Sequence, residues 1–142
     1  MKAFKPHVVG ISLRNIDTTQ KRDIFYYYKT LEPTVQLVKR VDPGVKVMIG
    51  GAGFSMFARK IMESITELDL CIYLEGDESV PELLNRLNNP GEVKGIFLRK
   101  DDDIIFTGQR HFPDIGKLAI PKRDFVDIKK YDDPVYTNIG IQ

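Results

Sequence analysis

The stretch from Val45 to Ser55 decides the fold; it reads Val-Lys-Val-Met-Ile-Gly-Gly-Ala-Gly-Phe-Ser. Its apolar, β-branched start predicts a short strand, its glycines predict a turn, and Ser55 predicts the N-cap of a helix. Ligands of open α/β sheets bind at the carboxyl ends of strands, where glycines let backbone N–H groups approach closely. The stretch therefore favours a ligand site, with a tight turn that contacts nothing as the alternative. Its glycine spacing matches neither the dinucleotide fingerprint nor the phosphate loop.

Length and composition predict one soluble globular domain. The 142 residues are 42% hydrophobic and 29% charged, which is ordinary for such a domain. A formal net charge of +1 gives no broad positive surface, so nucleic acid is not expected as a partner. Cys71 is the single cysteine, which excludes an internal disulfide and favours a reducing, cytoplasmic location. Neither a membrane-spanning stretch nor a signal-peptide pattern is present, so no membrane partner is expected.

The rest of the chain alternates between strand and helix patterns. Apolar runs at 8–11 and 68–74 predict two more strands, buried on both faces as in a covered parallel sheet. Helical spacing predicts buried stripes at Leu31, Val35, Val38 and Val41, at Ala58, Ile61, Met62 and Ile65, and at Val80, Leu83, Leu84 and Leu87. Ser79 and Glu82 have the spacing of a capping box. The alternation predicts a flavodoxin-like α/β fold, a parallel sheet with helices on both faces.

Three segments fall outside this alternation. The connection 13–29 is polar first and aromatic later, and it is expected to be either a lid over a site or a roof over the sheet. The segment 93–108 predicts an antiparallel hairpin and completes a domain of residues 1–108. Repeated prolines predict that residues 109–142 form an extended connector.

No catalytic constellation is visible in the sequence. It has no nucleophile elbow, no His-Glu-x-x-His motif and no paired cysteines, and neither His7 nor His111 has a partner pattern. Glu75 could meet a ligand at the end of its strand, or it could favour the N-terminus of the following helix. The residues alone indicate a binding module, and no catalytic residue or metal ligand is assigned.

Three blocks together resemble one family. They are Val-Val-Gly-Ile-Ser-Leu-Arg-Asn-Ile-Asp at 8–17, Ile-Gly-Gly-Ala-Gly-Phe-Ser at 49–55 and Glu-Gly-Asp-Glu-Ser-Val-Pro-Glu-Leu-Leu at 75–84. With Pro-Lys-Arg-Asp at 121–124 and the final Asn-Ile-Gly-Ile-Gln, they are similar to the cobalamin-binding domain and linker of cobalamin-dependent radical S-adenosylmethionine enzymes of the oxidative-cyclase-like type. The resemblance covers nearly the whole chain, which stops before the cysteine triplet that holds the family's iron–sulfur cluster.

The resemblance implies a role and a site. The domain would hold the corrinoid and its nucleotide tail at the carboxyl ends of the strands, for radical methyl transfer or related chemistry in a radical S-adenosylmethionine domain. That domain, outside this sequence, would be the partner and would carry the 4Fe-4S cluster and S-adenosylmethionine, so this chain alone is not expected to be catalytic. The resemblance implies that Ser12, Gly50 and Gly51 line the corrinoid and its nucleotide tail. The predicted cofactor-binding site also includes Leu13, Arg14, Asn15, Gly53, Glu75 and Gly76.

Two departures from the family keep other interpretations open. Family domains have two further strands before the one at Val8, and some carry an Asp-x-His-x-x-Gly motif whose histidine ligates cobalt; this sequence has neither. A degenerate docking or regulatory domain and a stand-alone flavin or nucleotide binder are the alternatives. In a sheet that is incomplete at its N-terminal side, the apolar edge from Val8 to Ser12 is expected to pair with a second copy or to be covered by the connector or tail.

Overall fold

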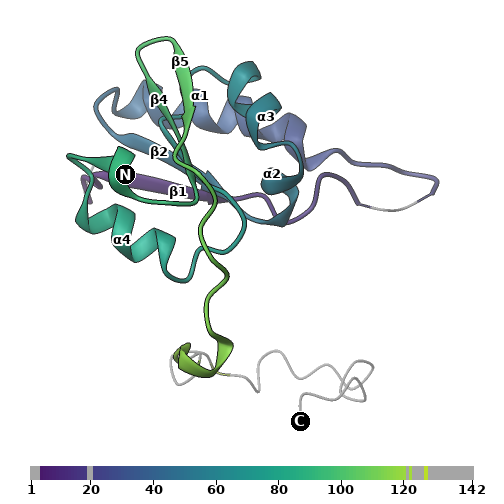
Figure 1. The fold of residues 1–142 in the computed structure, drawn as a ribbon. Helices are drawn as coiled ribbons and strands as arrows, with labels where there is room; N and C mark the ends of the chain where they lie inside the picture. Colours follow the sequence, from purple (N-terminus) through teal and green to yellow (C-terminus); the bar gives the residue numbers. More distant parts are fainter. Residues whose placement is uncertain (1–3, 19–20, 121, 123–126, 128–142) are drawn as a thin grey trace.

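Five strands form one sheet in the order β1-β2-β3-β4-β5 (Figure 1). The structure is a computed structural model that describes residues 4–18, 21–120, 122 and 127. The strands are β1 (Val8–Ser12), β2 (Lys46–Gly50), β3 (Leu70–Ile72), β4 (Ile96–Lys100) and β5 (Asp103–Phe106). The helices are α1 (Leu31–Val41), α2 (Ala52–Met56), α3 (Ala58–Ser64) and α4 (Ser79–Asn85), with short 3-10 helices at Tyr27–Thr30, Pro90–Glu92 and Ile115–Lys117.

The first three strands are parallel, and β4 and β5 are antiparallel to their neighbours. Gly10 lies beside Met48, and Met48 lies beside Leu70, which fixes the register across the parallel half. The mixed sheet with its flanking helices confirms the predicted α/β flavodoxin-like fold and the C-terminal hairpin. None of the helices in the described part of the chain is long and apolar enough to cross a membrane.

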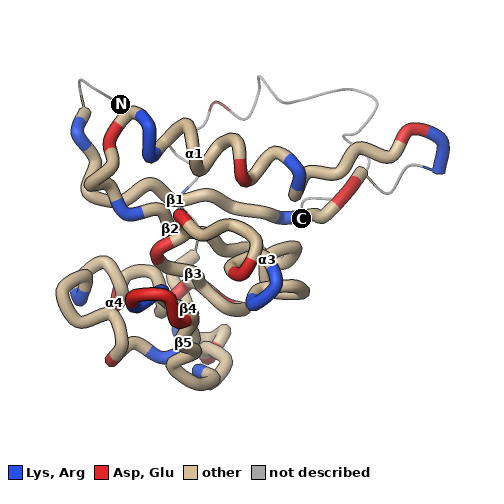
Figure 2. The backbone as a smooth tube through the Cα atoms, turned by 90° about the horizontal axis from the view of Figure 1, so that it is seen from above, with Lys and Arg blue, Asp and Glu red and all other residues tan. Residues whose placement is uncertain are grey.

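Each face of the sheet has its own core. Figure 1 shows α1 and α3 on one side of the sheet and α4 on the other. On the first side Val35, Phe54 and Met62 are fully buried with β2, and on the second side Leu83 and Ile96 are fully buried. In Figure 2, which shows the protein from above, α1 runs beside β1 and β2, whereas α4 lies beside β3 and β4. The α4 face of β1 and β2 therefore has no helix over it among the described residues.

Strand β1 is an edge strand, not the fully covered strand that its apolar run predicts. Its ladder joins β2 alone within the described residues, and Val8, Val9 and Ile11 are only half-buried. The central strand β2 instead carries the fully buried positions Val47 and Ile49. An apolar run on both faces thus indicates a strand but does not say how many neighbours it has. Pairing of this edge with a second copy stays a prediction.

The helix after the glycine turn begins earlier than predicted. Ser55 lies inside α2 and is not an N-cap, because the helix already starts at Ala52, after Gly51. Gly51 has a φ of 101°, a left-handed conformation that lets the chain turn directly from β2 into α2. The helix breaks at Phe57, and α3 starts again at Ala58.

Three other helix predictions are wrong in detail. The capping box does not form, because the hydroxyl of Ser79 donates to the carbonyl of Glu75 and the N-cap is Glu78. Val41 is 38% exposed and Leu84 is 45% exposed, although helical spacing predicted both as buried. Both lie in the last turn of their helix, Val41 as the final residue of α1 and Leu84 directly after the fully buried Leu83 of α4.

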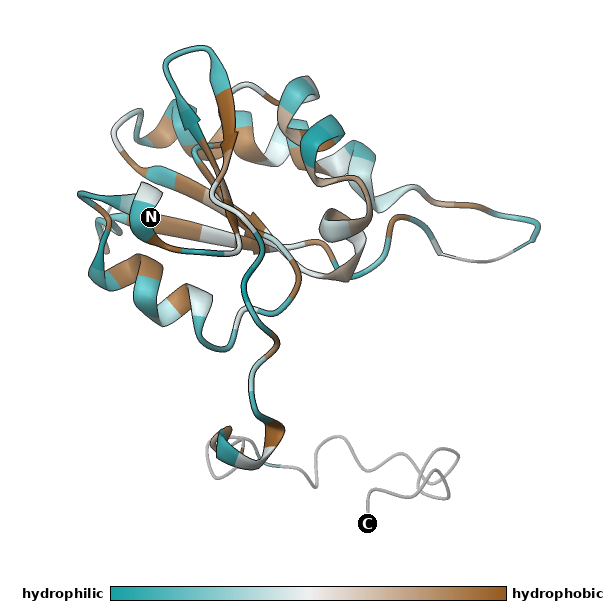
Figure 3. Ribbon diagram, viewed as in Figure 1, coloured by the Kyte–Doolittle hydropathy of each residue, from teal (hydrophilic) through white to brown (hydrophobic). Residues whose placement is uncertain are grey.

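The connection between β1 and α1 forms an arm that projects from the body (Figure 1). An isolated bridge joins Asp17 to Tyr26, and one limb of the arm is hydrophobic (Figure 3). Phe25 is 51% exposed and Tyr27 is 41% exposed, so these aromatic residues do not roof the sheet. The roof interpretation is wrong, and the lid interpretation stays a prediction. Most of the predicted connector, including 123–126 and 128–142, lies outside the described residues.

Candidate cofactor-binding groove

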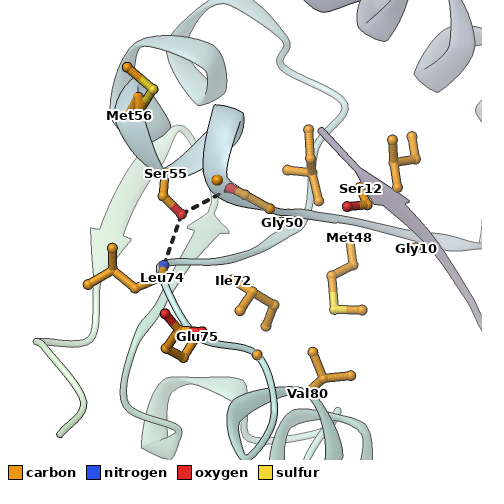
Figure 4. Close-up of a pocket in the computed structure, with 15 residues that line it drawn as sticks. Gly10, Ser12, Met48, Gly50, Ser55, Met56, Ile72, Leu74, Glu75 and Val80 are labelled. Carbon is orange, nitrogen blue, oxygen red and sulfur yellow. Dashed lines mark hydrogen bonds between the residues drawn. The ribbon is translucent and has the colours of Figure 1, made fainter. Parts of the chain in front are cut away.

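A groove of about 700 Å³ opens at the carboxyl ends of β1, β2 and β3 (Figure 4). Each of the three strands contributes its last residues, α2 forms one wall and the start of α4 forms the other. The lining residues are Gly10, Ile11, Ser12, Met48, Ile49, Gly50, Gly51, Ala52, Ser55, Met56, Ile72, Leu74, Glu75, Gly76 and Val80. This is the end of a parallel sheet at which ligands of α/β proteins bind.

The groove exists because small residues form part of its floor, on the face of the sheet that no described helix covers. Side chains alternate along a strand, so Gly10 and Ser12 of β1 share one face, which in register is also the face of Met48 and Gly50 of β2. A Cβ on Gly10 would meet only the Met48 Cε methyl, at an ordinary contact distance of 3.6 Å. The side chains of Met48, Ile72 and Val80 line the same hollow in Figure 4. The floor is therefore apolar and unobstructed at β1.

The other glycines of the turn serve the protein itself. A Cβ on Gly51 would lie 2.7 Å from the carbonyl oxygen of Leu13, and one on Gly53 would lie 3.0 Å from the same oxygen. The N–H of Gly53 donates to the carbonyl of Arg14 at 2.9 Å, and the N–H of Phe54 donates to that of Leu13 at 3.3 Å. The first turn of α2 is thus packed against the backbone that leaves β1, and its N–H groups at 53 and 54 are not available to a ligand.

The hydroxyl of Ser55 ties the α2 wall to the end of β3. It donates to the carbonyl of Gly51 at 3.1 Å and accepts from the N–H of Leu74 at 2.9 Å (Figure 4). Leu74 has a φ of 63°, which is unusual for a residue with a side chain. The bond helps to hold this turn, from which Glu75 and Gly76 continue along the opposite wall.

Arginine 110 fixes the wall formed by α4. Its guanidinium donates to Glu78 at 3.1 Å and to Glu82 at 2.6 Å. The hydrogen bond to Glu82 is the largest cause that raises the pKa of Arg110, with partial burial opposing it and the Glu78 contact adding to it. The ion pairs attach the start of the connector to α4, which keeps the connector close to the helix that borders the groove.

Few polar side chains face the groove. Ser12 is exposed at the rim, and its hydroxyl has no hydrogen bond to any other described residue. Glu75 is exposed on the opposite wall. Within the described ranges, no group of histidine, cysteine and carboxylate side chains is placed to hold a metal ion, and His7 and His111 lie away from the groove lining. Cys71 lies in the core beneath the groove, where burial raises the pKa of its thiol.

The structure brings together part of the predicted site. Ser12, Gly50, Gly51, Glu75 and Gly76 line the groove. Leu13, Arg14, Asn15 and Gly53 do not; the side chain of Leu13 is in the core, those of Arg14 and Asn15 are exposed on the loop, and Gly53 packs under that loop. Cofactor binding by any of these residues stays a prediction.

Sequence reasoning missed the residues that shape the floor. Gly10, Met48, Ile72 and Val80 line the groove but carry no recognisable motif. The alternation of Gly10 and Ser12, two small residues two apart in a strand, was the one signal available. This spacing indicates a groove only when β1 is known to be an edge strand with an uncovered face.

Comparison with known structures finds several chains that share this fold. The chain matches the radical S-adenosylmethionine methyltransferase TsrM from Kitasatospora setae, whose structure has cobalamin and a 4Fe-4S cluster bound. The TM-score is 0.63, the identity is 18%, and the match covers 82% of this chain. The chain shares its fold with part of that enzyme. At this identity the likeness shows the fold alone.

The match spans 21% of the length of the methyltransferase, so most of that enzyme has no counterpart in this chain. No protein-family model matches the chain, and neither does any curated protein sequence. The activity of the whole methyltransferase therefore does not carry over as a finding.

Proposed function

We propose that this chain is a cobalamin-binding domain that holds the nucleotide tail of the corrinoid in the groove at the carboxyl ends of β1, β2 and β3. The observation that carries the proposal is the uncovered face of β1 at Gly10, where the floor of the groove carries no side chain. The fold likeness to a cobalamin-containing methyltransferase supports it. In such an enzyme the bound corrinoid supplies methyl-transfer or radical chemistry.

The residues present fit a cofactor with a flat, largely apolar appendage. A volume of about 700 Å³ lies within the usual range of small-molecule pockets, roughly 300–1,000 Å³, and is too small for a whole corrinoid. Gly10 leaves the floor open where any side chain would fill it, and the apolar side chains of Met48, Ile72 and Val80 are placed to contact a ring. The hydroxyl of Ser12 is free to donate to an acceptor at the rim.

The groove offers no imidazole, which limits what the chain does for the metal. Neither described histidine lines the groove. The residues of this chain would therefore bind and orient the cofactor through its tail, and they would exclude water from the apolar floor. Radical methyl transfer or related chemistry, the 4Fe-4S cluster and S-adenosylmethionine would belong to a further domain.

The test is a titration of the chain with hydroxocobalamin, followed by absorbance. Gly10→Leu fills the groove without straining the strand, because the new Cβ lies at an ordinary contact distance from Met48. We expect this variant to weaken binding at least about tenfold, as a filled apolar pocket does. Gly91→Leu is the matched control, because a Cβ there meets nothing within 4 Å.

The other interpretations predict different results. A docking domain without a cofactor predicts no saturable spectral change with the unaltered chain. A flavin or nucleotide binder predicts that flavin mononucleotide binds, and that Gly10→Leu weakens flavin instead of cobalamin. Equal weakening by Gly10→Leu and Gly91→Leu would show that cobalamin binds elsewhere on the protein.

A further inference from the structure

We infer that the ridge formed by Met56, Phe57, Arg59 and Lys60, together with the two hollows that Phe57 borders, is a docking surface for a protein segment that carries carboxylates beside an aromatic or aliphatic side chain. The ridge occupies the break between α2 and α3. It shares only Ser55 and Met56 with the lining of the cofactor groove, so the inference stands apart from the proposed function.

The backbone presents apolar side chains to solvent at this ridge. Phe57 leaves helical geometry, with φ of −134° and ψ of 28°, and it separates α2 from α3. Met56 is 71% exposed and Phe57 is 48% exposed, whereas Phe54, one turn earlier, is fully buried. Exposed apolar residues that occur singly are ordinary, but adjacent ones beside concave surfaces mark interaction sites.

Phe57 borders two separate hollows. One has a volume of about 460 Å³ and is backed by the ring cluster of Tyr73, Phe97 and Phe106. Phe97 and Phe106 stack with centroids 4.6 Å apart, and Tyr73 meets Phe106 edge-on at 5.5 Å. The other hollow has a volume of about 400 Å³ and lies between α3 and the base of the arm, where Ile16 and Tyr28 line it. Side chains of a partner could enter both.

The charged side chains that line the two hollows are both basic. Arg59 and Lys60 are the only charged residues among those that line the two hollows. The guanidinium of Arg59 lies 5.9 Å from the centre of the Phe97 ring, which orients it over the aromatic floor. Neither cation forms an ion pair with another described residue. Two cations next to an aromatic floor, unpaired among the described residues, are complementary to a partner segment in which carboxylates flank an apolar side chain.

A protein segment fits this surface better than a nucleic acid or a membrane does. Nucleic-acid binding draws its affinity from many phosphate contacts, and two cations supply few of them. A lipid surface would contact the exposed Met56 and Phe57 but would not place separate side chains in the two hollows that Phe57 borders. A peptide-like segment can place separate side chains in both.

The test uses the 15N-labelled chain 1–142 and two synthetic peptides, acetyl-Glu-Asp-Phe-Glu-Leu-Asp-amide and its lysine analogue, acetyl-Lys-Lys-Phe-Lys-Leu-Lys-amide. We expect the acidic peptide to shift the backbone amides of residues 56–60 saturably, and the lysine peptide to bind about tenfold more weakly. The double variant Arg59→Glu, Lys60→Glu should reverse this preference. The matched control, Lys21→Glu, Arg22→Glu, makes the same charge change on exposed arm residues and should leave it intact.

Several results would overturn the inference. They are equal binding of the two peptides, shifts confined to residues outside the ridge and its hollows, or the same reversal in the arm variant. Binding to vesicles of phosphatidylserine and phosphatidylcholine that the ridge variant abolishes would assign the surface to a membrane instead. Hydroxocobalamin binding should be the same in the ridge variant and the unaltered chain, so loss of cofactor binding and loss of docking are separate outcomes.

Discussion

The hydroxyl of Ser55 accepts a hydrogen bond from the backbone N–H of Leu74 at 2.9 Å, across the top of the sheet. Ser55 belongs to α2, and Leu74 follows β3 by two residues. The same hydroxyl donates to the carbonyl of Gly51, so one side chain satisfies a helix carbonyl and a turn N–H together. This contact sets the distance between the α2 wall of the groove and the turn that leads to α4.

Replacing Ser55 should lower the stability of the fold and increase the mobility of the turn at Leu74, which borders the groove. Ser55→Ala leaves the N–H of Leu74 without its partner and removes the hold on a turn whose φ is 63°. We expect a loss of about 1–2 kcal/mol in the free energy of unfolding, measured by urea denaturation. Faster hydrogen exchange of the Leu74 amide should accompany it.

A serine in the next helix is the control for this prediction. The hydroxyl of Ser64 donates to the carbonyl of Ile61 within α3 and joins no second element. Ser64→Ala should therefore cost less than about 0.5 kcal/mol and leave exchange at Leu74 unchanged. Equal costs for the two variants would show that the Ser55 contact does not hold the turn.

The fold was predictable from the sequence because its signals are local. An apolar run introduced by Pro6 marks β1, one closed by glycines marks β2, and the pattern change after Pro90 marks the hairpin. Burial was less predictable, because it depends on neighbours that local patterns do not specify. Val8 and Val47 have similar local patterns, yet only the second is fully buried, since β1 is the edge of the sheet.

The site was predictable only in outline. Glycines after a strand indicated the carboxyl end of the sheet, where the structure has a groove, but they did not indicate which glycines leave space and which remove a clash. Binding in this groove stays a prediction. Gly10 opens the groove, whereas Gly51 and Gly53 let α2 pack against the loop after β1. That distinction requires the register of β1 with β2, which arises from long-range pairing and has no local signature.

Gly51 should tolerate substitution least among the turn glycines. Its φ of 101° is strained for any other residue, and a Cβ would lie 2.7 Å from the rigid carbonyl oxygen of Leu13. We expect Gly51→Ala to lower the free energy of unfolding by at least about 2 kcal/mol. Gly91→Ala, where a Cβ meets nothing within 4 Å, should change it by less than about 0.5 kcal/mol.

Asp69 joins three segments at the amino end of the sheet, opposite the groove. Its carboxylate accepts from the ammonium of Lys39 at 2.7 Å, from the N–H of Val47 at 2.8 Å and from Lys46 at 3.2 Å. Burial alone would raise the pKa of Asp69, but the hydrogen bonds from Lys39 and Val47 and the charges of the two lysines outweigh it, so the pKa is lowered. The carboxylate is thus stabilised in the folded protein relative to the unfolded chain.

The sign of the resulting pH dependence follows from this lowered pKa. The folded protein binds the Asp69 proton less readily than the unfolded chain, whose reference value is 3.8. The stabilisation is therefore complete above about pH 5 and is lost as the pH falls through 3.8 toward the folded value. Asp69→Asn should cost about 1–3 kcal/mol at neutral pH and less as the pH falls through this range.

Asp102→Asn, on the exposed hairpin turn, is the control and should leave the pH dependence of the unfolding free energy as it is in the unaltered chain. A profile for Asp69→Asn parallel to that of the unaltered chain between pH 5 and pH 2, measured by urea denaturation, would show that this carboxylate does not contribute to acid stability.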